Sequence, residues 1–135
     1  MANNDKIFII EDEISIVKLL NFHLEKNNYS VHVSYDGVNI VEKVLKAKPS
    51  LILLDLMIPG NDGFEVCRLL RSNNATQLTP IIMISAKSED SSIVAGLECG
   101  ADDYITKPFS MQVLLAKIRK NIRKKITLSK HKKWD

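Results

Sequence analysis

Five short apolar segments recur along this chain of 135 residues, at intervals of about 20 to 30 residues, and amphipathic segments separate them. Three of them, KIFII, LILLD and IIMIS, are almost continuously apolar and rich in Ile. Such segments are typical of strands that are covered on both faces, as in a parallel sheet. The strands that we expect span residues 6–10, 30–35, 51–55, 81–85 and 103–106.

The segments between the strands carry apolar residues at helical spacing. The helices that this spacing predicts span residues 13–27, 37–47, 62–72, 89–99 and 111–125. In the fourth helix, Ile93, Val94 and Leu97 form the expected apolar stripe. Ser88 precedes this helix and Ser110 precedes the last one, and we expect each serine to cap the helix that follows it.

The regular alternation of strand and helix predicts an α/β fold, a doubly wound (βα)5 sandwich of three layers around a five-stranded parallel sheet. Right-handed crossovers leave few strand orders. We favour the flavodoxin-like order 2-1-3-4-5, because the second strand is the least apolar and suits a sheet edge. Ligands of such sheets bind beyond the carboxyl ends of the strands, at the switch point between strands one and three.

Acidic residues follow the two strands that flank this switch point. Glu11 and Asp12 come directly after the first strand, and Asp55 ends the third. Like charges that crowd together need a compensating charge, and a small carboxylate cluster with room for water suits Mg²⁺. The three acids therefore predict a magnesium site. Read separately, Glu11 to Glu13 could form the acidic start of a helix, and Asp55 could cap a turn.

A lysine and a serine belong to the neighbouring strand ends. Ser85 ends the fourth strand and Lys107 follows the fifth. A lysine beside a metal site suits a phosphoryl group, because the two cations together neutralise its oxygens. A carboxylate can act as the nucleophile and form an aspartyl phosphate. Asp55 lies at the centre of the predicted site and is the expected acceptor.

Charge is unevenly distributed along the chain. Residues 1–116 carry 10 Lys and Arg against 15 Asp and Glu, a formal charge of −5, whereas residues 117–135 carry 9 against 1, a formal charge of +8. We expect residues 126–135 to form a basic C-terminal tail. Cations are favourable at the end of a helix, and weak, salt-dependent contact with nucleic acid is the alternative role.

Several classes of protein are disfavoured by composition. The chain has no apolar run long enough for a membrane span and no recognisable signal peptide. Its two cysteines lack the spacing of a zinc site, and we expect reduced thiols in a cytoplasmic protein. No Gly-rich loop follows the first strand, which argues against nucleotide binding.

The motifs IIEDE, LILLDLMIPGNDG, IIMISA and GADDYITKPFS, in this order and spacing, resemble the receiver domain of bacterial two-component response regulators. The resemblance covers about residues 5–125, and we assign residues 1–125 to this domain. The last motif most resembles the subfamily in which the receiver precedes a winged-helix DNA-binding domain.

The resemblance implies a phosphorylation site and a metal site. Asp55 would accept a phosphoryl group from a sensor histidine kinase. Glu11, Asp12 and Asp55 would hold Mg²⁺ together with the backbone carbonyl of Met57. Glu11 stands where many relatives have Asp, and its longer side chain still offers a carboxylate.

It also implies a catalytic and switching apparatus. Lys107 would match the invariant lysine of the family, and Ser85 the switch serine or threonine. Tyr104 would match the aromatic residue that turns inward on activation, and the Lys107-Pro108 bond would be cis.

Active dimers of the DNA-binding subfamily use the face formed by the fourth helix, the fifth strand and the fifth helix. The residues of this sequence expected in such an interface are Ile93, Glu98, Asp102, Asp103, Val113, Lys117, Arg119 and Lys124. Ile93 and Val113 are apolar where an Arg–Glu pair is usual, so that contact would become hydrophobic.

The resemblance thus implies a signalling switch that catalyses only its own phosphorylation and dephosphorylation, and that controls dimerisation or a partner in transcription. DNA contact would require an effector domain that this chain does not contain. The alternative is a stand-alone receiver that acts by protein contact or as a phosphorelay intermediate. A phosphatase with an aspartate nucleophile would need a second acid where Met57 stands, and is disfavoured.

Overall fold

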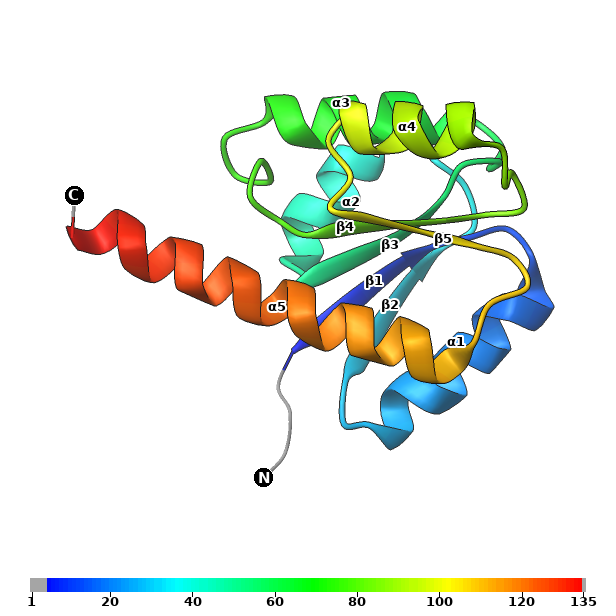
Figure 1. The fold of residues 1–135 in the computed structure, drawn as a ribbon, viewed down its shortest axis with the longest axis horizontal. Helices are drawn as coiled ribbons and strands as arrows, with labels where there is room; N and C mark the ends of the chain where they lie inside the picture. Colours follow the sequence, from blue (N-terminus) through cyan, green and yellow to red (C-terminus); the bar gives the residue numbers. More distant parts are fainter. Residues whose placement is uncertain (1–4, 135) are drawn as a thin grey trace.

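A five-stranded parallel sheet with the strand order β2-β1-β3-β4-β5 forms the centre of the molecule (Figure 1). The computed structural model describes the backbone of residues 5–134 and the side chains of residues 5–124. The strands are β1 (Lys6–Ile10), β2 (Ser30–Ser34), β3 (Leu51–Asp55), β4 (Ile81–Ser85) and β5 (Asp103–Thr106). The predicted fold class and strand order are confirmed.

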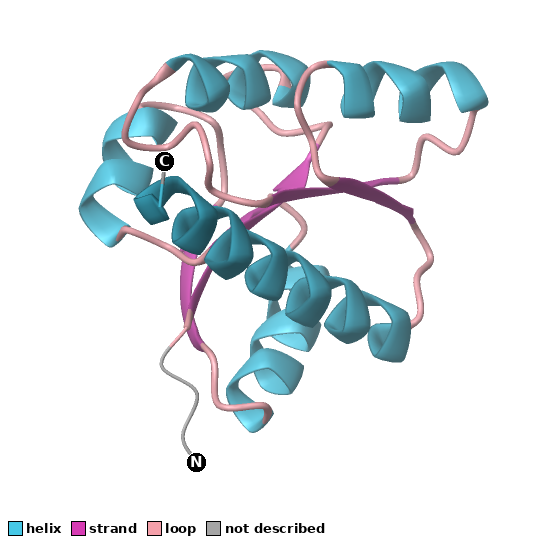
Figure 2. Ribbon diagram, turned by 60° about the vertical axis from the view of Figure 1, so that its left-hand side comes forward, coloured by secondary structure: helices cyan, strands magenta, loops and turns pink. Residues whose placement is uncertain are grey.

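Helices cover both faces of this sheet. They are α1 (Ile14–Lys26), α2 (Ile40–Ala47), α3 (Gly63–Ser72), α4 (Asp90–Glu98) and α5 (Met111–Trp134). As Figures 1 and 2 show, α1 and α5 lie on one face, and α2, α3 and α4 lie on the other. None of the described helices is both long and apolar enough to cross a membrane.

The central strands are apolar throughout because successive side chains point to opposite, equally covered faces. In β1, Ile7 and Ile9 pack with residues of α1 and α5. Phe8 and Ile10 point to the other face and pack with residues of α2 and α3. Each such side chain contributes about 1.5–3 kcal/mol by leaving water, and the sheet separates the two hydrophobic clusters.

Most helix boundaries lie within one residue of the sequence prediction, and two differ by more. Helix α2 begins at Ile40, later than expected, because the preceding residues form a turn in which the Val38 amide donates to Asp36 Oδ1 (3.0 Å) and Asn39 is left-handed (φ 51°). Helix α5 continues to Trp134, across the domain boundary that we expected at residue 125.

The two expected serine caps have different outcomes. The Val113 amide donates to Ser110 Oγ (3.3 Å), so Ser110 caps α5 as predicted. The prediction for Ser88 is wrong, because α4 begins one residue later than expected and its N-cap position falls on Glu89.

Helix α4 packs on the sheet through a glycine. The expected stripe is wrong for Val94 and Leu97, whose side chains are 50% and 45% exposed, and the buried residue of the helix is Gly96. A Cβ at Gly96 would lie 2.8 Å from Met83 Sδ and 2.9 Å from Tyr104 Cδ2. The missing side chain therefore lets the helix backbone approach these two residues closely.

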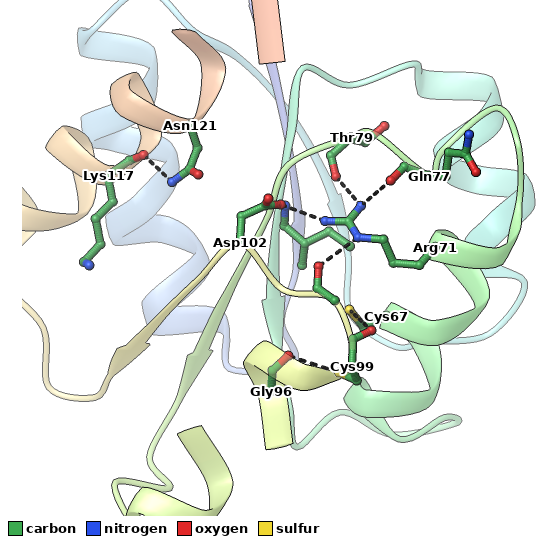
Figure 3. Close-up of polar contacts among 11 residues, drawn as sticks. Cys67, Arg71, Gln77, Thr79, Gly96, Cys99, Asp102, Lys117 and Asn121 are labelled. Carbon is green, nitrogen blue, oxygen red and sulfur yellow. Dashed lines mark hydrogen bonds and ion pairs between the residues drawn. The ribbon is translucent and has the colours of Figure 1, made fainter. Parts of the chain in front are cut away.

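Arg71, near the end of α3, joins α3, the loop before β4 and the turn between α4 and β5 (Figure 3). Its guanidinium donates to Gly100 O (2.8 Å), Gln77 O (3.2 Å), Thr79 O (2.6 Å) and Asp102 Oδ2 (2.7 Å). Asp102 Oδ2 also accepts from the Ile81 amide (2.9 Å) at the start of β4. This network fixes the point at which the chain enters β5.

We predict that Arg71→Met lowers the free energy of unfolding by about 2 kcal/mol, because it leaves the partly buried Asp102 carboxylate and several carbonyls without their charged donor. Urea denaturation would measure the change. Arg68→Met is the matched control: Arg68 pairs with Glu65 on the exposed side of the same helix (3.3 Å), and its loss should cost at most about 0.5 kcal/mol. Equal losses in the two variants would contradict a special role for Arg71.

Candidate functional site

The candidate site lies where the carboxyl ends of β1, β3, β4 and β5 meet at one edge of the sheet. Glu11 follows β1, Asp55 ends β3, Ser85 ends β4 and Lys107 follows β5. The parallel register places Asp55 opposite Ile84 and Ser85 opposite Thr106. Strand pairing therefore brings together groups that are up to 96 residues apart in the sequence.

Three acids form the centre of this site. Glu11, Asp12 and Asp55 each offer a carboxylate oxygen, and these oxygens all lie within 4.8 Å of one another. Glu11 and Asp55 are 2% and 5% exposed, whereas Asp12 is exposed. Backbone amides fix the two buried carboxylates, since the Met57 amide donates to Asp55 Oδ1 (3.0 Å) and the Glu13 amide donates to Glu11 Oε2 (3.1 Å).

Lys107 brings one positive charge to this cluster. Its Nζ lies 2.8 Å from Glu11 Oε1 and 3.1 Å from Asp55 Oδ2. Glu13 Oε1 lies 4.0 Å from the same amine. We expected Glu13 only as part of an acidic helix start, and the structure shows that it also faces the lysine from the open side of the site.

The pKa of Glu11 is raised mainly because its carboxyl group is buried. Burial, together with a hydrogen bond to Asp55, raises the pKa of Glu11 to about 7, against the opposing effect of Lys107. Burial works to lower the pKa of Lys107, but its bonds to Glu11 and Asp55 outweigh burial and hold that pKa above the ordinary value. The site therefore has more carboxylate charge than one lysine balances, which fits a hard divalent cation with oxygen ligands.

Ser85 and Tyr104 are linked through the backbone of Lys87. Ser85 is fully buried, and its Oγ accepts a hydrogen bond from the Lys87 amide (3.1 Å). The Tyr104 hydroxyl donates to the Lys87 carbonyl (2.8 Å). Tyr104 thus points inward in this structure, with its ring against Gly96 of α4.

The β5–α5 connection adopts the expected backbone form. The Lys107-Pro108 peptide bond is cis, as the resemblance implied. The Lys107 amide donates to the Ser85 carbonyl (2.8 Å), which continues the strand pairing up to the lysine itself. Ile105 packs on the face of the sheet opposite to Tyr104.

The residues expected in a dimer interface lie on α4, β5 and α5 and, for Asp102, in the turn just before β5, around the β5 edge of the sheet (Figure 1). Asp102 bonds to Arg71, and Asp103 Oδ1 accepts from Lys117 Nζ (2.9 Å), so that three of these residues have partners within the chain. The other members are exposed or half-buried: Ile93, Glu98, Val113, Arg119 and Lys124.

Comparisons with known proteins agree with this geometry. The family model of the response regulator receiver domain matches residues 7–119. The chain therefore belongs to the response regulator receiver family, and it folds as a receiver of two-component systems.

Three solved structures illustrate the similarity. The N-terminal receiver domain of RstA from Klebsiella pneumoniae, in a BeF3-activated form, is 36% identical, with 88% of this chain and 99% of that chain covered and a TM-score of 0.81. A putative response regulator from Chloroflexus aurantiacus is 28% identical, with coverage of 90% and 99% and a TM-score of 0.85. The receiver domain of a sensor histidine kinase from Pseudomonas aeruginosa, with a magnesium ion coordinated in its active site cleft, is 25% identical, with coverage of 89% and 98% and a TM-score of 0.81.

Sequence reasoning missed three residues that shape the site. Glu13 faces Lys107, the backbone of Lys87 links Ser85 to Tyr104, and Gly96 makes room for the tyrosine ring. A carboxylate directly after Glu11 and Asp12 was a usable signal for Glu13. The other two act through backbone, which side-chain chemistry in the sequence does not reveal.

The raised pKa of Glu11 predicts a pH dependence of stability. The folded chain retains a proton on Glu11 up to about pH 7, whereas the unfolded chain releases it near the ordinary value. The stability contributed by this proton is fully present below the unfolded pKa and is lost as the pH rises through about 7. Thermal unfolding of the metal-free protein between pH 5 and pH 8 should show this loss.

Glu11→Gln provides the control for this prediction, because an amide does not titrate. The melting temperature of the wild type should fall relative to that of the variant by a few degrees between pH 5 and pH 8. Parallel pH profiles for the two proteins would show that Glu11 is already ionised in the folded chain at pH 5.

Proposed function

We propose that this receiver accepts a phosphoryl group on Asp55 from a sensor histidine kinase in a Mg²⁺-dependent reaction, and that it thereby changes its α4–β5–α5 side to control dimerisation or a partner protein. The observation that carries the proposal is the position of Lys107 Nζ, 3.1 Å from Asp55 Oδ2 and beside the acidic cluster. This arrangement offers a buried nucleophile and a cation for the incoming phosphoryl oxygens.

The residues that would hold Mg²⁺ are Glu11, Asp12 and Asp55 through their carboxylates and Met57 through its backbone carbonyl. Support comes from the proximity of the three carboxylates and from the raised pKa of Glu11. The Pseudomonas receiver with magnesium in its active site cleft offers a parallel. A bound Mg²⁺ would supply positive charge that offsets the phosphoryl oxygens.

The transfer is a substitution at phosphorus. An Asp55 carboxylate oxygen forms a bond to phosphorus as the phosphorus–nitrogen bond of phosphohistidine breaks, and the electron pair of that bond stays on the imidazole. Lys107 neutralises a phosphoryl oxygen, and the cis bond that follows it belongs to the loop that presents its side chain. Ser85 Oγ already accepts from the Lys87 amide, which leaves its own hydrogen to donate to a phosphoryl oxygen.

The hydrogen bonds around Lys87 supply a route from this chemistry to α4. A shift of Ser85 toward a phosphoryl oxygen would change its bond with Lys87, whose carbonyl holds the Tyr104 hydroxyl. The tyrosine ring lies against Gly96, so its position bears directly on α4. Ser85 and Tyr104 are therefore the proposed switch residues.

The chain would act on itself rather than turn over a separate substrate. A phosphatase with an aspartate nucleophile requires an acid two residues beyond it, and here the exposed Met57 occupies that position.

The two cysteines are free thiols, which fits the cytoplasm, where thiols stay reduced.

Transcriptional control is the proposed output, through an effector domain outside this chain. Its support is the resemblance of GADDYITKPFS to receivers that precede a winged-helix domain, and the 36% identity to the N-terminal receiver domain of RstA. The second candidate is a receiver that acts alone through protein contact or relays its phosphoryl group.

We predict that acetyl phosphate labels the wild-type chain in the presence of Mg²⁺, and that Asp55→Asn or chelation of the metal reduces labelling at least 100-fold. Phosphate-affinity electrophoresis or intact mass would measure this. Asp36→Asn removes a carboxylate that pairs with Lys43 outside the site (3.6 Å), and should label normally. Persistent labelling of the Asp55 variant would place the acceptor elsewhere.

We further predict that Ser85→Ala still binds beryllofluoride with Mg²⁺ but loses most of the amide chemical-shift change at Tyr104 and along α4, because the hydroxyl that joins the ligand to Lys87 is gone. Two-dimensional NMR would measure these shifts. Ser15→Ala, an exposed change in α1, should respond as the wild type does. Unchanged shifts in the Ser85 variant would refute the route through Lys87.

A further inference from the structure

The outward face of α5 is basic to a degree that phosphorylation chemistry does not explain. The segment from residue 104 to residue 134 contains no Asp or Glu. Among its described residues, five cations lie within eight positions: Lys117, Arg119, Lys120, Arg123 and Lys124. These five residues are called the basic face of α5.

The helix geometry gathers these cations on one side. Leu114, Ile118 and Ile122 are buried against the sheet and α1. At 3.6 residues per turn, the basic face occupies the half of the helix opposite to this buried stripe. Four of its members are exposed, and Lys117 is half-buried beside Asp103.

Repulsion between these cations destabilises the helix itself. Arg119 and Arg123, and likewise Lys120 and Lys124, stand four residues apart, and like charges at this spacing repel. Other helices mix their charges, as in the Arg68–Glu65 pair of α3. The favourable interaction of cations with a helix C-terminus offsets only part of this repulsion.

We infer that the basic face of α5 binds the phosphate backbone of nucleic acid without sequence preference. Such binding requires cations that displace counterions and no apolar contact. The exposed positions between residues 117 and 124 carry no large apolar side chain, whereas a specific protein interface has an apolar core and an interfacial membrane helix inserts an apolar face. A polyanion therefore fits the exposed cations between residues 117 and 124 better than an apolar surface or a bilayer, and it would compete with the dimer contacts proposed for Lys117, Arg119 and Lys124.

The test measures fluorescence anisotropy of a labelled 20-base-pair DNA duplex of arbitrary sequence with the whole chain. Four phosphate contacts predict a slope of about −3.6 for log Kobs against log[KCl], a loss of roughly 150-fold in affinity between 50 and 200 mM KCl. Lys120→Glu with Lys124→Glu should weaken binding at 50 mM KCl at least tenfold. Replacing the same two lysines by Gln should give a smaller loss in the same direction.

Lys18→Glu with Lys46→Glu is the matched control, because it makes the same change in net charge at exposed positions of α1 and α2. The control should bind within twofold of the wild type. An equal loss in both double variants would overturn the inference in favour of net charge alone. Binding without salt dependence, or no binding at 50 mM KCl, would also overturn it.

Two further measurements distinguish this inference from membrane binding and from the phosphoacceptor proposal. The first is binding to vesicles that contain phosphatidylserine. If the chain binds these vesicles but not the duplex, the basic face is a membrane site and the proposal is refuted. Asp55→Asn should bind the duplex as the wild type does, so failure of the phosphoacceptor proposal and failure of this one are distinguishable.

Discussion

The ammonium group of Lys107 lies between two buried carboxylates, and the rest of the site is arranged around this contact. Glu11 and Asp55 come from neighbouring strands of a parallel sheet and would repel each other without it. Burial and a hydrogen bond to Asp55 raise the pKa of Glu11, although the lysine opposes this shift. In the proposed reaction, Mg²⁺ would add positive charge to this acidic site, and the amine of Lys107 already lies where a phosphoryl oxygen would arrive.

The sheet and its two hydrophobic clusters hold these charged groups together. Alternate side chains of β1, β3 and β4 are buried on opposite faces, so the strand ends are fixed from both sides. The network around Arg71 fixes the entry to β5 at the other end of the strand, far from the chemistry. A rigid frame of this kind holds the charged groups close together.

Much of the fold and of the site was predictable from the sequence because the signals were local and repeated. Continuous apolar strands, helical spacing and turn residues place the elements along the chain. Right-handed crossovers and the less apolar second strand favour the strand order, and the polar residues at the strand ends then fall at one edge. Val94 and Leu97 were misassigned because an apolar stripe indicates only that a helix has one apolar side. The packing of Gly96 depends on Met83 and Tyr104, which adjoin it only in the folded chain. The intrachain partner of Asp102 could not be foreseen either, since Arg71 lies 31 residues earlier.

The packing of α4 through Gly96 and the half-buried Ile93 has an energetic consequence. A helix anchored by large aliphatic side chains would lose several kcal/mol of burial on being displaced, whereas α4 leaves Val94 and Leu97 in solvent in the arrangement described. Displacement of α4 would therefore cost less buried apolar area than displacement of a helix anchored by large aliphatic side chains. If phosphorylation acts through Tyr104 as proposed, this shallow packing would make α4 responsive to a small change at the site.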